Sequence, residues 1–273
     1  MLYFLLLYKL EIKIKLQGDK NMNEVIKTIN KRVSLRKYKE KEISKEDLDI
    51  IINSAIKAPT AGNMMMYSIL KITDEKTKET LSKTCDNQPF IKKAPVILIF
   101  LADMQKWYDY YKVCKVEDIK SPGMNDFMLS VNDAIIACQN AVLAAESLGI
   151  GSCYIGDIME NYEVHKELLN LPDYTFPAAM ITLGYYPENI KRVYKERFKK
   201  EYVVFDEKYN RLDDNDLIKM FEDKEKSMLK FNAFNVESFG EFMYKRKTSA
   251  DFSVEMDRSI KEWIKVFTNG AGL

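Results

Sequence analysis

The segment from Asn132 to Leu148, NDAIIACQNAVLAAESL, constrains this 273-residue chain more than any other. The spacing of its apolar residues predicts a helix. Apolar residues occupy most of the circumference, so we expect the helix to be buried on several sides. Gly149 and Gly151 are expected to end it. Hydrophobic residues make up 47% of the chain, which is ample for the core that such a helix needs.

Shorter segments around this helix predict alternating helices and strands. Val96 to Ala102, VILIFLA, is a continuous apolar run typical of a central strand. Ser44 followed by Asp47 predicts an N-cap for a helix from Lys45 to Lys57. Further strands are predicted over Ser68 to Thr73, Ser152 to Ile155 and Phe176 to Leu183, with a strand-like run over Tyr202 to Phe205. This alternation predicts an α+β or an α/β fold.

The chain divides into three parts. Residues 1–21 are interpreted as a non-native extension that precedes a true start at Met22, or as an arm that docks on a partner. The apolar run at its beginning is too short to span a bilayer. Residues 22–206 form the main domain, and residues 207–273 form a helical extension that packs on it or on a partner subunit. Within the extension, Ser253 is a candidate N-cap.

Charge and cysteine content exclude several classes of function. The chain has 42 basic and 41 acidic residues, so no overall field favours nucleic acid. The cysteines are Cys85, Cys114, Cys138 and Cys153, without a CxxC pair, and the one histidine, His165, is expected at the surface. We therefore expect no metal site. Cys138 and Cys153 are expected in the core, and unpaired thiols are typical of a reducing cytoplasm.

The segment RVSLRKY is the first candidate binding motif. Arg32, Ser34 and Arg36 alternate, so in an extended chain their side chains face the same way. Two guanidinium groups and a hydroxyl suit a phosphate. The alternative is a solvated basic loop.

The segment PTAGN is the second motif. Gly62 permits a positive φ, and Ala61 leaves the backbone approachable. Asn63 offers both a donor and an acceptor, which matches the edge of a flavin or pterin ring. The alternative is an ordinary turn at the end of a helix.

Two later segments are weaker candidates. GIGSCYIGD places glycines around a short strand, where backbone N–H groups can face a planar ligand, but its context is not that of a Rossmann site. KERFKK contains Lys195 and Arg197, and a solvated surface run is the alternative there.

Taken together, the order and spacing of these motifs resemble the nitroreductase family of flavoenzymes over about Asn23 to Asp206. The resemblance implies an α+β fold with a central, mostly antiparallel sheet flanked by helices. It implies an intertwined homodimer with FMN at the interface. It also implies reduction by NADH or NADPH, followed by transfer to a second substrate in the same pocket.

The resemblance also implies roles for individual residues. Arg32, Ser34 and Arg36 would bind the FMN phosphate and ribityl chain, and Arg197 with Lys195 would complete the phosphate site. The flavin would be lined, from the other subunit, by Pro59, Thr60, Ala61 and Asn63. Ile155 and Gly156 would place backbone N–H groups near the reactive ring nitrogen, and Asn87 or Gln88 would reach the pyrimidine side.

The chain departs from the family at two positions. Many members have a glutamine where Met65 stands, and some have a lysine where Phe90 stands, whereas Tyr67 keeps the aromatic character of its position. These departures bear on flavin tuning and substrate preference.

The predicted function is FMN-dependent reduction of nitroaromatic, quinone or similar conjugated acceptors by NADH or NADPH. Hydride would pass from nicotinamide to flavin and on to the acceptor in ping-pong order, so no catalytic side chain is expected. Three alternatives remain open: a flavin-consuming or dehalogenating enzyme with residues Trp107–Tyr111 as a lid, a non-enzymatic flavin sensor, and an interaction module without a cofactor.

Overall fold

The computed structural model describes residues 23–195, 197–228 and 234–268. The predicted N-terminal extension, residues 1–21, and the predicted start at Met22 lie outside this part of the chain.

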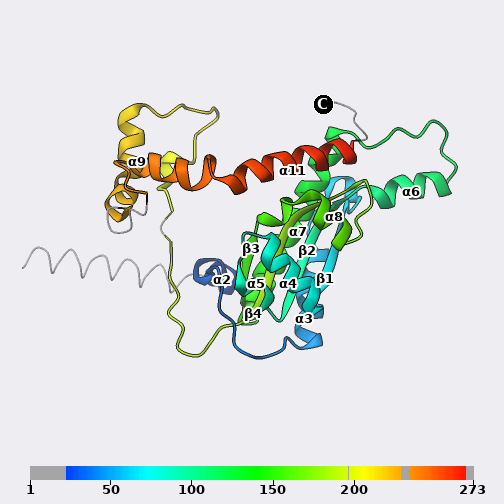
Figure 1. Ribbon diagram of the computed structural model, residues 1–273, viewed down its shortest axis with the longest axis horizontal. Coiled ribbons are helices and arrows are strands. Elements are labelled where there is room, and N and C mark those ends of the chain that lie inside the picture. The colour runs from blue at the N-terminus through cyan, green and yellow to red at the C-terminus, as the bar shows by residue number, and fades with distance from the viewer. Residues whose placement is uncertain (1–22, 196, 229–233, 269–273) are drawn as a thin grey trace, which may run out of the picture.

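A four-stranded antiparallel sheet forms the centre of the molecule (Figure 1). Its strands follow the order β1-β2-β4-β3, and each neighbouring pair is antiparallel. The strands are β1 (Tyr67–Ile72), β2 (Val96–Asp103), β3 (Ile150–Ile155) and β4 (Thr175–Tyr185). The α+β prediction is therefore confirmed. All residues of β2 are buried, as expected for an inner strand.

The long apolar helix is α7 (Met124–Ser147), which begins earlier than the predicted start at Asn132. It packs against all four strands and against α3 (Lys45–Ile56). By length and composition α7 could cross a membrane, but one face of it packs on the sheet and on α3, as in a core helix. Gly149, at φ 74°, follows the helix as predicted, whereas Gly151 belongs to β3.

The remaining elements of the main domain surround this core. They are α2 (Glu24–Lys31), η1 (Ala61–Asn63), α4 (Glu75–Thr84), α5 (Pro89–Lys92), α6 (Gln105–Val113), η2 (Asp157–Met159) and α8 (Tyr162–Leu168). The Ser44 hydroxyl accepts a hydrogen bond from the Asp47 amide, so the predicted N-cap of α3 is confirmed. The strand-like run predicted over Tyr202 to Phe205 is wrong. Among the described residues no strand pairs with it, and the short helix η3 (Lys200–Tyr202) ends at its first residue.

The chain then leaves the sheet and forms α9 (Asp214–Met228), α10 (Phe239–Met243), η4 (Tyr244–Thr248) and α11 (Asp251–Phe267). Figure 1 shows α9 apart from the sheet and α11 running back over the main domain. Trp263 and Phe267 on α11 are fully buried there, against Phe176 and Phe127. Ser253 is not the N-cap of α11, because the helix starts at Asp251 and Ala250 occupies the cap.

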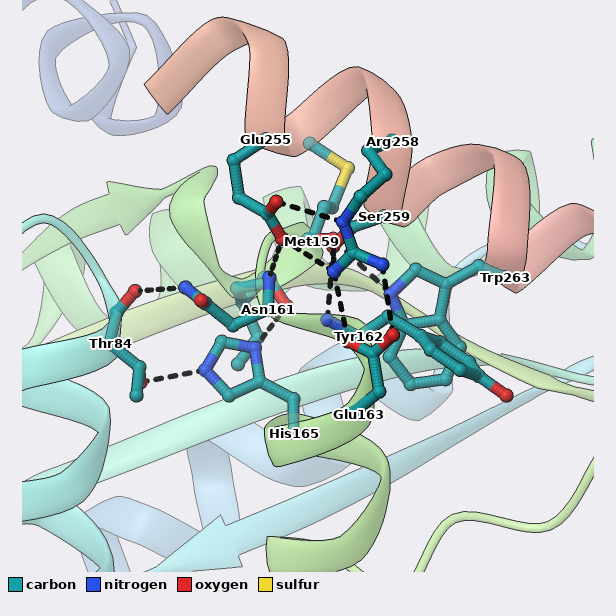
Figure 2. Close-up of polar contacts among 11 residues, drawn as sticks. Thr84, Met159, Asn161, Tyr162, Glu163, His165, Glu255, Arg258, Ser259 and Trp263 are labelled. Carbon is teal, nitrogen blue, oxygen red and sulfur yellow. Dashed lines mark hydrogen bonds and ion pairs between the residues drawn. The ribbon is translucent and has the colours of Figure 1, made fainter. Parts of the chain in front are cut away.

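Polar contacts also fix α11 to the main domain (Figure 2). Glu255 Oε1 accepts from the Asn161 amide at 3.2 Å, and Ser259 Oγ accepts from the Tyr162 amide at 3.0 Å. The Trp263 indole N–H donates to the Met159 carbonyl at 3.2 Å. The C-terminal helix therefore braces the backbone that follows β3.

His165 lies beneath this contact and is completely buried, so the expectation of a surface histidine is wrong. One ring nitrogen lies 2.7 Å from Thr84 Oγ1 and the other 2.9 Å from the Ile158 carbonyl. Burial lowers the pKa of the imidazole. Both ring nitrogens are occupied by structural partners, which explains how a histidine is accommodated in the core.

Candidate functional site

The segment of residues 32–38 crosses the sheet at β3 and β4. The Leu35 amide donates to the Ser152 carbonyl at 2.8 Å. The Tyr38 hydroxyl donates to Thr182 Oγ1 at 2.6 Å. These two bonds hold the segment in an extended course against the two strands.

Two glycines allow this close approach. Gly151 of β3 and Gly184 of β4 are cross-strand partners. A Cβ on Gly151 would lie 2.5 Å from Leu35 Cδ2, and a Cβ on Gly184 would lie 2.5 Å from Tyr38 Cδ1. The segment therefore rests on a patch of sheet that has no side chains.

The three predicted phosphate ligands meet beside Cys153 on β3. Burial raises the pKa of the Cys153 thiol, while the charges of Arg36 and Arg32 and a hydrogen bond with Ser34 oppose that rise. The Arg36 guanidinium also lies 5.9 Å from the centre of the Phe90 ring. The structure thus brings both arginines and the serine together, with Phe90 at the edge of the cluster.

The predicted flavin-lining residues form a short loop between α3 and β1, namely Pro59, Thr60, Ala61, Asn63 and Met65. Gly62, Asn63 and Met65 have positive φ angles of 56°, 57° and 51°. Thr60 Oγ1 accepts from the Met65 amide at 3.2 Å. We call residues 59–65 the flavin-facing turn, after the role predicted for it.

A buried carboxylate that the sequence analysis did not assign supports this turn. Asp133 of α7 is 2% exposed, and its two oxygens accept from the amides of Ala61 at 2.9 Å and Met66 at 3.2 Å. The available signal was an acidic residue directly before the apolar run Ala134–Cys138 of the helix.

A hollow of about 310 Å³ lies between the turn and α6, lined by Met64, Met65, Lys106, Trp107 and Tyr110. The Trp107 indole N–H donates to the Met64 carbonyl at 2.8 Å, so the indole ring is fixed against the turn. Lys106 Nζ donates to the Tyr67 carbonyl at 2.7 Å. The hollow is therefore lined by methionine and aromatic side chains and by the ammonium group of Lys106.

Gln88, rather than Asn87, is connected to the end of β3. Gln88 Nε2 donates to Asp157 Oδ2 at 2.6 Å, directly after Gly156. Asn87 is exposed and has a positive φ of 48°. Ile155, the last residue of β3, is buried, and Gly156, which follows the strand, is exposed and has no side chain to cover its backbone.

A second buried carboxyl follows this strand end. Glu160 is 4% exposed, and its Oε1 has no hydrogen-bond partner among the described residues. Burial raises its pKa to about 8, with smaller contributions from the negative charges of Asp157 and Asp86.

Lys195 and Arg197 are exposed on the extended segment that leaves β4 (Figure 1). Within the described residues, no hydrogen bond or ion pair joins either side chain to residues 32–36. Their place in a phosphate site stays a prediction.

Arg192 is the basic residue of that segment that does contact the main domain. It donates to the Lys31 carbonyl at 2.7 Å, pairs with the buried Glu146 of α7, and lies 4.0 Å from the centre of the Tyr186 ring. The cluster fixes the backbone immediately before Arg32. Sequence reasoning missed both Arg192 and Glu146.

The chain is similar to known proteins in sequence and in fold. A family model described as "Nitroreductase family" matches residues 29–185. The chain is 34% identical over 191 residues to a Bacillus subtilis "FMN reductase (NADPH)", which covers 69% of this chain and 76% of the relative. It is 33% identical over 193 residues to a second protein of that organism, "FMN reductase [NAD(P)H]", covering 69% and 75%. Among solved structures, the "NfrA1 nitroreductase from B. subtilis" superposes with a TM-score of 0.76 at 26% identity, covering 88% of this chain and 98% of that one.

Proposed function

Since the chain belongs to the nitroreductase family and is an FMN-dependent oxidoreductase that uses NADH or NADPH, we propose that it reduces nitroaromatic, quinone or similar conjugated acceptors in ping-pong order. One observation carries the proposal. The same fold contains a cluster of hydrogen-bond donors suited to a phosphate (Arg32, Ser34 and Arg36) and the tight flavin-facing turn with its methionine side chains.

The donor set fits FMN. Arg32, Ser34 and Arg36 offer two guanidinium groups and a hydroxyl around Cys153, which is the chemistry that a phosphate and a ribityl chain need. The exposed Gly156 leaves the backbone at the end of β3 approachable. Gln88 lies beside that strand end, suited to the pyrimidine side of the ring.

We infer that a complete site needs two copies of the chain. Within the described residues, no hydrogen bond or ion pair joins residues 32–36 to the flavin-facing turn. Large apolar side chains are exposed on two helices that leave apolar faces uncovered: Val25, Ile26 and Ile29 on α2, and Met128, Leu129, Ile135 and Ile136 on α7. Apolar faces of this kind mark association surfaces. They support a homodimer in which each flavin is held by the donor cluster of one subunit and the turn of the other.

The acceptor and the nicotinamide would use one pocket in turn. The hollow beside the turn, walled by Met65, Trp107 and Tyr110, suits flat conjugated rings. Because both substrates would occupy the same place, one must leave before the other binds, and this gives ping-pong kinetics.

The bound FMN supplies the redox chemistry, and the chain's residues bind and orient. Arg32 and Arg36 would neutralise the phosphate, and the apolar side chains of the flavin-facing turn would pack against the ring. In the described residues the four cysteines are free, which supports a reducing compartment such as the cytoplasm.

Two experiments test the proposal. Initial rates with NADPH varied at several fixed menadione concentrations should give parallel double-reciprocal lines; intersecting lines would refute the ping-pong order. Arg36→Ala should weaken FMN binding about tenfold or more, since it removes a charge-assisted contact. Lys37→Ala, a neighbouring exposed cation, is the matched control and should leave binding unchanged. An Arg36→Ala protein that retains full flavin would contradict the assignment.

A further inference from the structure

Asp133 is a buried carboxylate for which the proposed function has so far given no role. It lies on α7, and its side chain reaches out of the helix to the loop that precedes β1. No lysine or arginine pairs with it among the described residues. A buried carboxylate without a cation is costly unless hydrogen bonds replace its hydration.

Its two bonds bracket the flavin-facing turn. Oδ1 accepts from the Ala61 amide and Oδ2 accepts from the Met66 amide, so one side chain holds a residue near each end of the loop. Both donors are backbone groups that the turn cannot satisfy internally, because it has neither helical nor strand pairing at these positions.

The turn itself is conformationally unfavourable. Asn63 and Met65 are non-glycine residues held at φ 57° and 51°, beside Gly62 at 56°. Such conformations persist only where the surroundings enforce them, and they cluster at ligand-binding sites. Thr60 Oγ1 closes the turn from within by accepting from the Met65 amide, and the Trp107 indole donates to the Met64 carbonyl, whereas Asp133 ties the turn to the core helix α7.

We propose that Asp133 is a positioning residue that holds the flavin-facing turn in the conformation that receives the flavin ring. The inference rests on the proposed function, because it assumes that the turn contacts FMN. Chemistry explains why a carboxylate is needed: its two oxygens are both acceptors. An asparagine of the same shape would direct its amide group at one of the two backbone N–H donors.

Asp133→Asn is therefore the discriminating variant. A residue that only fills space would tolerate the isosteric change. A residue that must accept two hydrogen bonds would not tolerate it. Asp126→Asn is the matched control, because Asp126 lies on the same helix and its carboxylate caps the helix by accepting from the Gly123 amide at 2.9 Å, away from the turn.

The measurements are FMN dissociation constants of the apoproteins and the visible circular dichroism of bound FMN. For Asp133→Asn we expect the dissociation constant to rise about tenfold or more, since one charge-assisted hydrogen bond is lost, together with an altered flavin dichroism. Asp126→Asn should stay within about twofold of the wild type. Trp107 fluorescence in the apoprotein should also shift in Asp133→Asn, because the indole is bonded to the turn.

Thr60→Val covers the case in which Asp133→Asn fails to fold. It removes the hydroxyl that accepts from the Met65 amide at 3.2 Å without touching the core, and it should weaken FMN binding in the same direction. The inference is overturned if a folded Asp133→Asn binds FMN with wild-type affinity and dichroism, or if Asp133→Asn does not fold and Thr60→Val binds normally. A wild-type protein that takes up no FMN would instead overturn the proposed function itself, and the turn assignment with it.

Discussion

Gly151→Ala gives the sharpest test of how the sheet presents the phosphate-binding segment. The added Cβ would lie 2.5 Å from Leu35 Cδ2, 2.8 Å from Tyr186 Cζ and 2.9 Å from Leu35 Cβ, whereas ordinary contact begins at 3.4 Å. Leu35 is 2% exposed, so its side chain is enclosed by neighbouring residues. Leu35 must therefore move away from β3 by about 0.9 Å, taken from the shortest of those contacts, and the Tyr186 ring must also give way.

This displacement has two measurable consequences. Overpacking of this kind costs about 1–3 kcal/mol of folding free energy. Ser34 and Arg36 flank Leu35 and move with it, and a misplacement of about 1 Å can lower the performance of a site about 100-fold. We expect the FMN dissociation constant to rise about tenfold to 100-fold.

Gly149→Ala is the control, two residues away. No atom lies within 4 Å of its added Cβ, but Gly149 has φ +74°. The variant should therefore lose about 1 kcal/mol through backbone strain while residues 32–38 stay in place.

Urea denaturation and fluorescence titration with FMN measure the two effects for each variant. If Gly149→Ala and Gly151→Ala lose FMN affinity equally, or if Gly151→Ala binds FMN like the wild type, then residues 32–38 do not depend on the glycine patch and the reasoning is refuted.

Three further predictions concern stability. Trp263→Ala should lower the free energy of unfolding by about 3–5 kcal/mol, because a fully buried indole is lost; a change below about 1 kcal/mol in urea denaturation would show that α11 does not brace the domain. Tyr38→Phe should cost about 1–1.5 kcal/mol, since the hydroxyl that donates to Thr182 disappears; an unchanged denaturation midpoint would contradict this. Glu160 has a folded-state pKa of about 8 against an ordinary 4.5. Between these two pH values the folded chain keeps a proton on Glu160 that the unfolded chain releases. The contribution of Glu160 to the free energy of unfolding should therefore fall as the pH rises from 4.5 to about 8. Glu160→Gln should flatten the pH dependence of Tm between these limits, and an unaltered profile would argue against the raised pKa.

Local patterns in the sequence predicted much of the fold. The inner strand β2, the cap at Ser44 and the core helix followed by Gly149 all depend on neighbouring residues, so periodicity and cap chemistry identify them. The start of α7 was predicted too late, although Met124, Phe127, Met128 and Val131 in its first two turns already follow the helical spacing.

Long-range partners could not be predicted in this way. His165 appeared polar by its neighbours, but one of its ring nitrogens contacts Thr84, which lies 81 residues away in the sequence. Asp133 supports the flavin-facing turn from 67 residues away or more. Such pairings depend on tertiary structure, and a single sequence contains no direct signal for them.

The site residues also divide into those that a local pattern predicts and those that depend on long-range contacts. Arg32, Ser34 and Arg36 share a face because an extended chain alternates, and the structure brings them together. Arg192 reaches the backbone before Arg32 only because the chain turns back after β4.

The most direct test of the proposed function is an anaerobic absorption spectrum of the purified protein, recorded before and after NADH and then NADPH are added. We predict a yellow protein that is bleached by one or both donors and regains its colour when a quinone or nitroaromatic is added. A yellow protein that neither donor bleaches would contradict the reductase, and a colourless protein that takes up no added FMN would contradict the cofactor site.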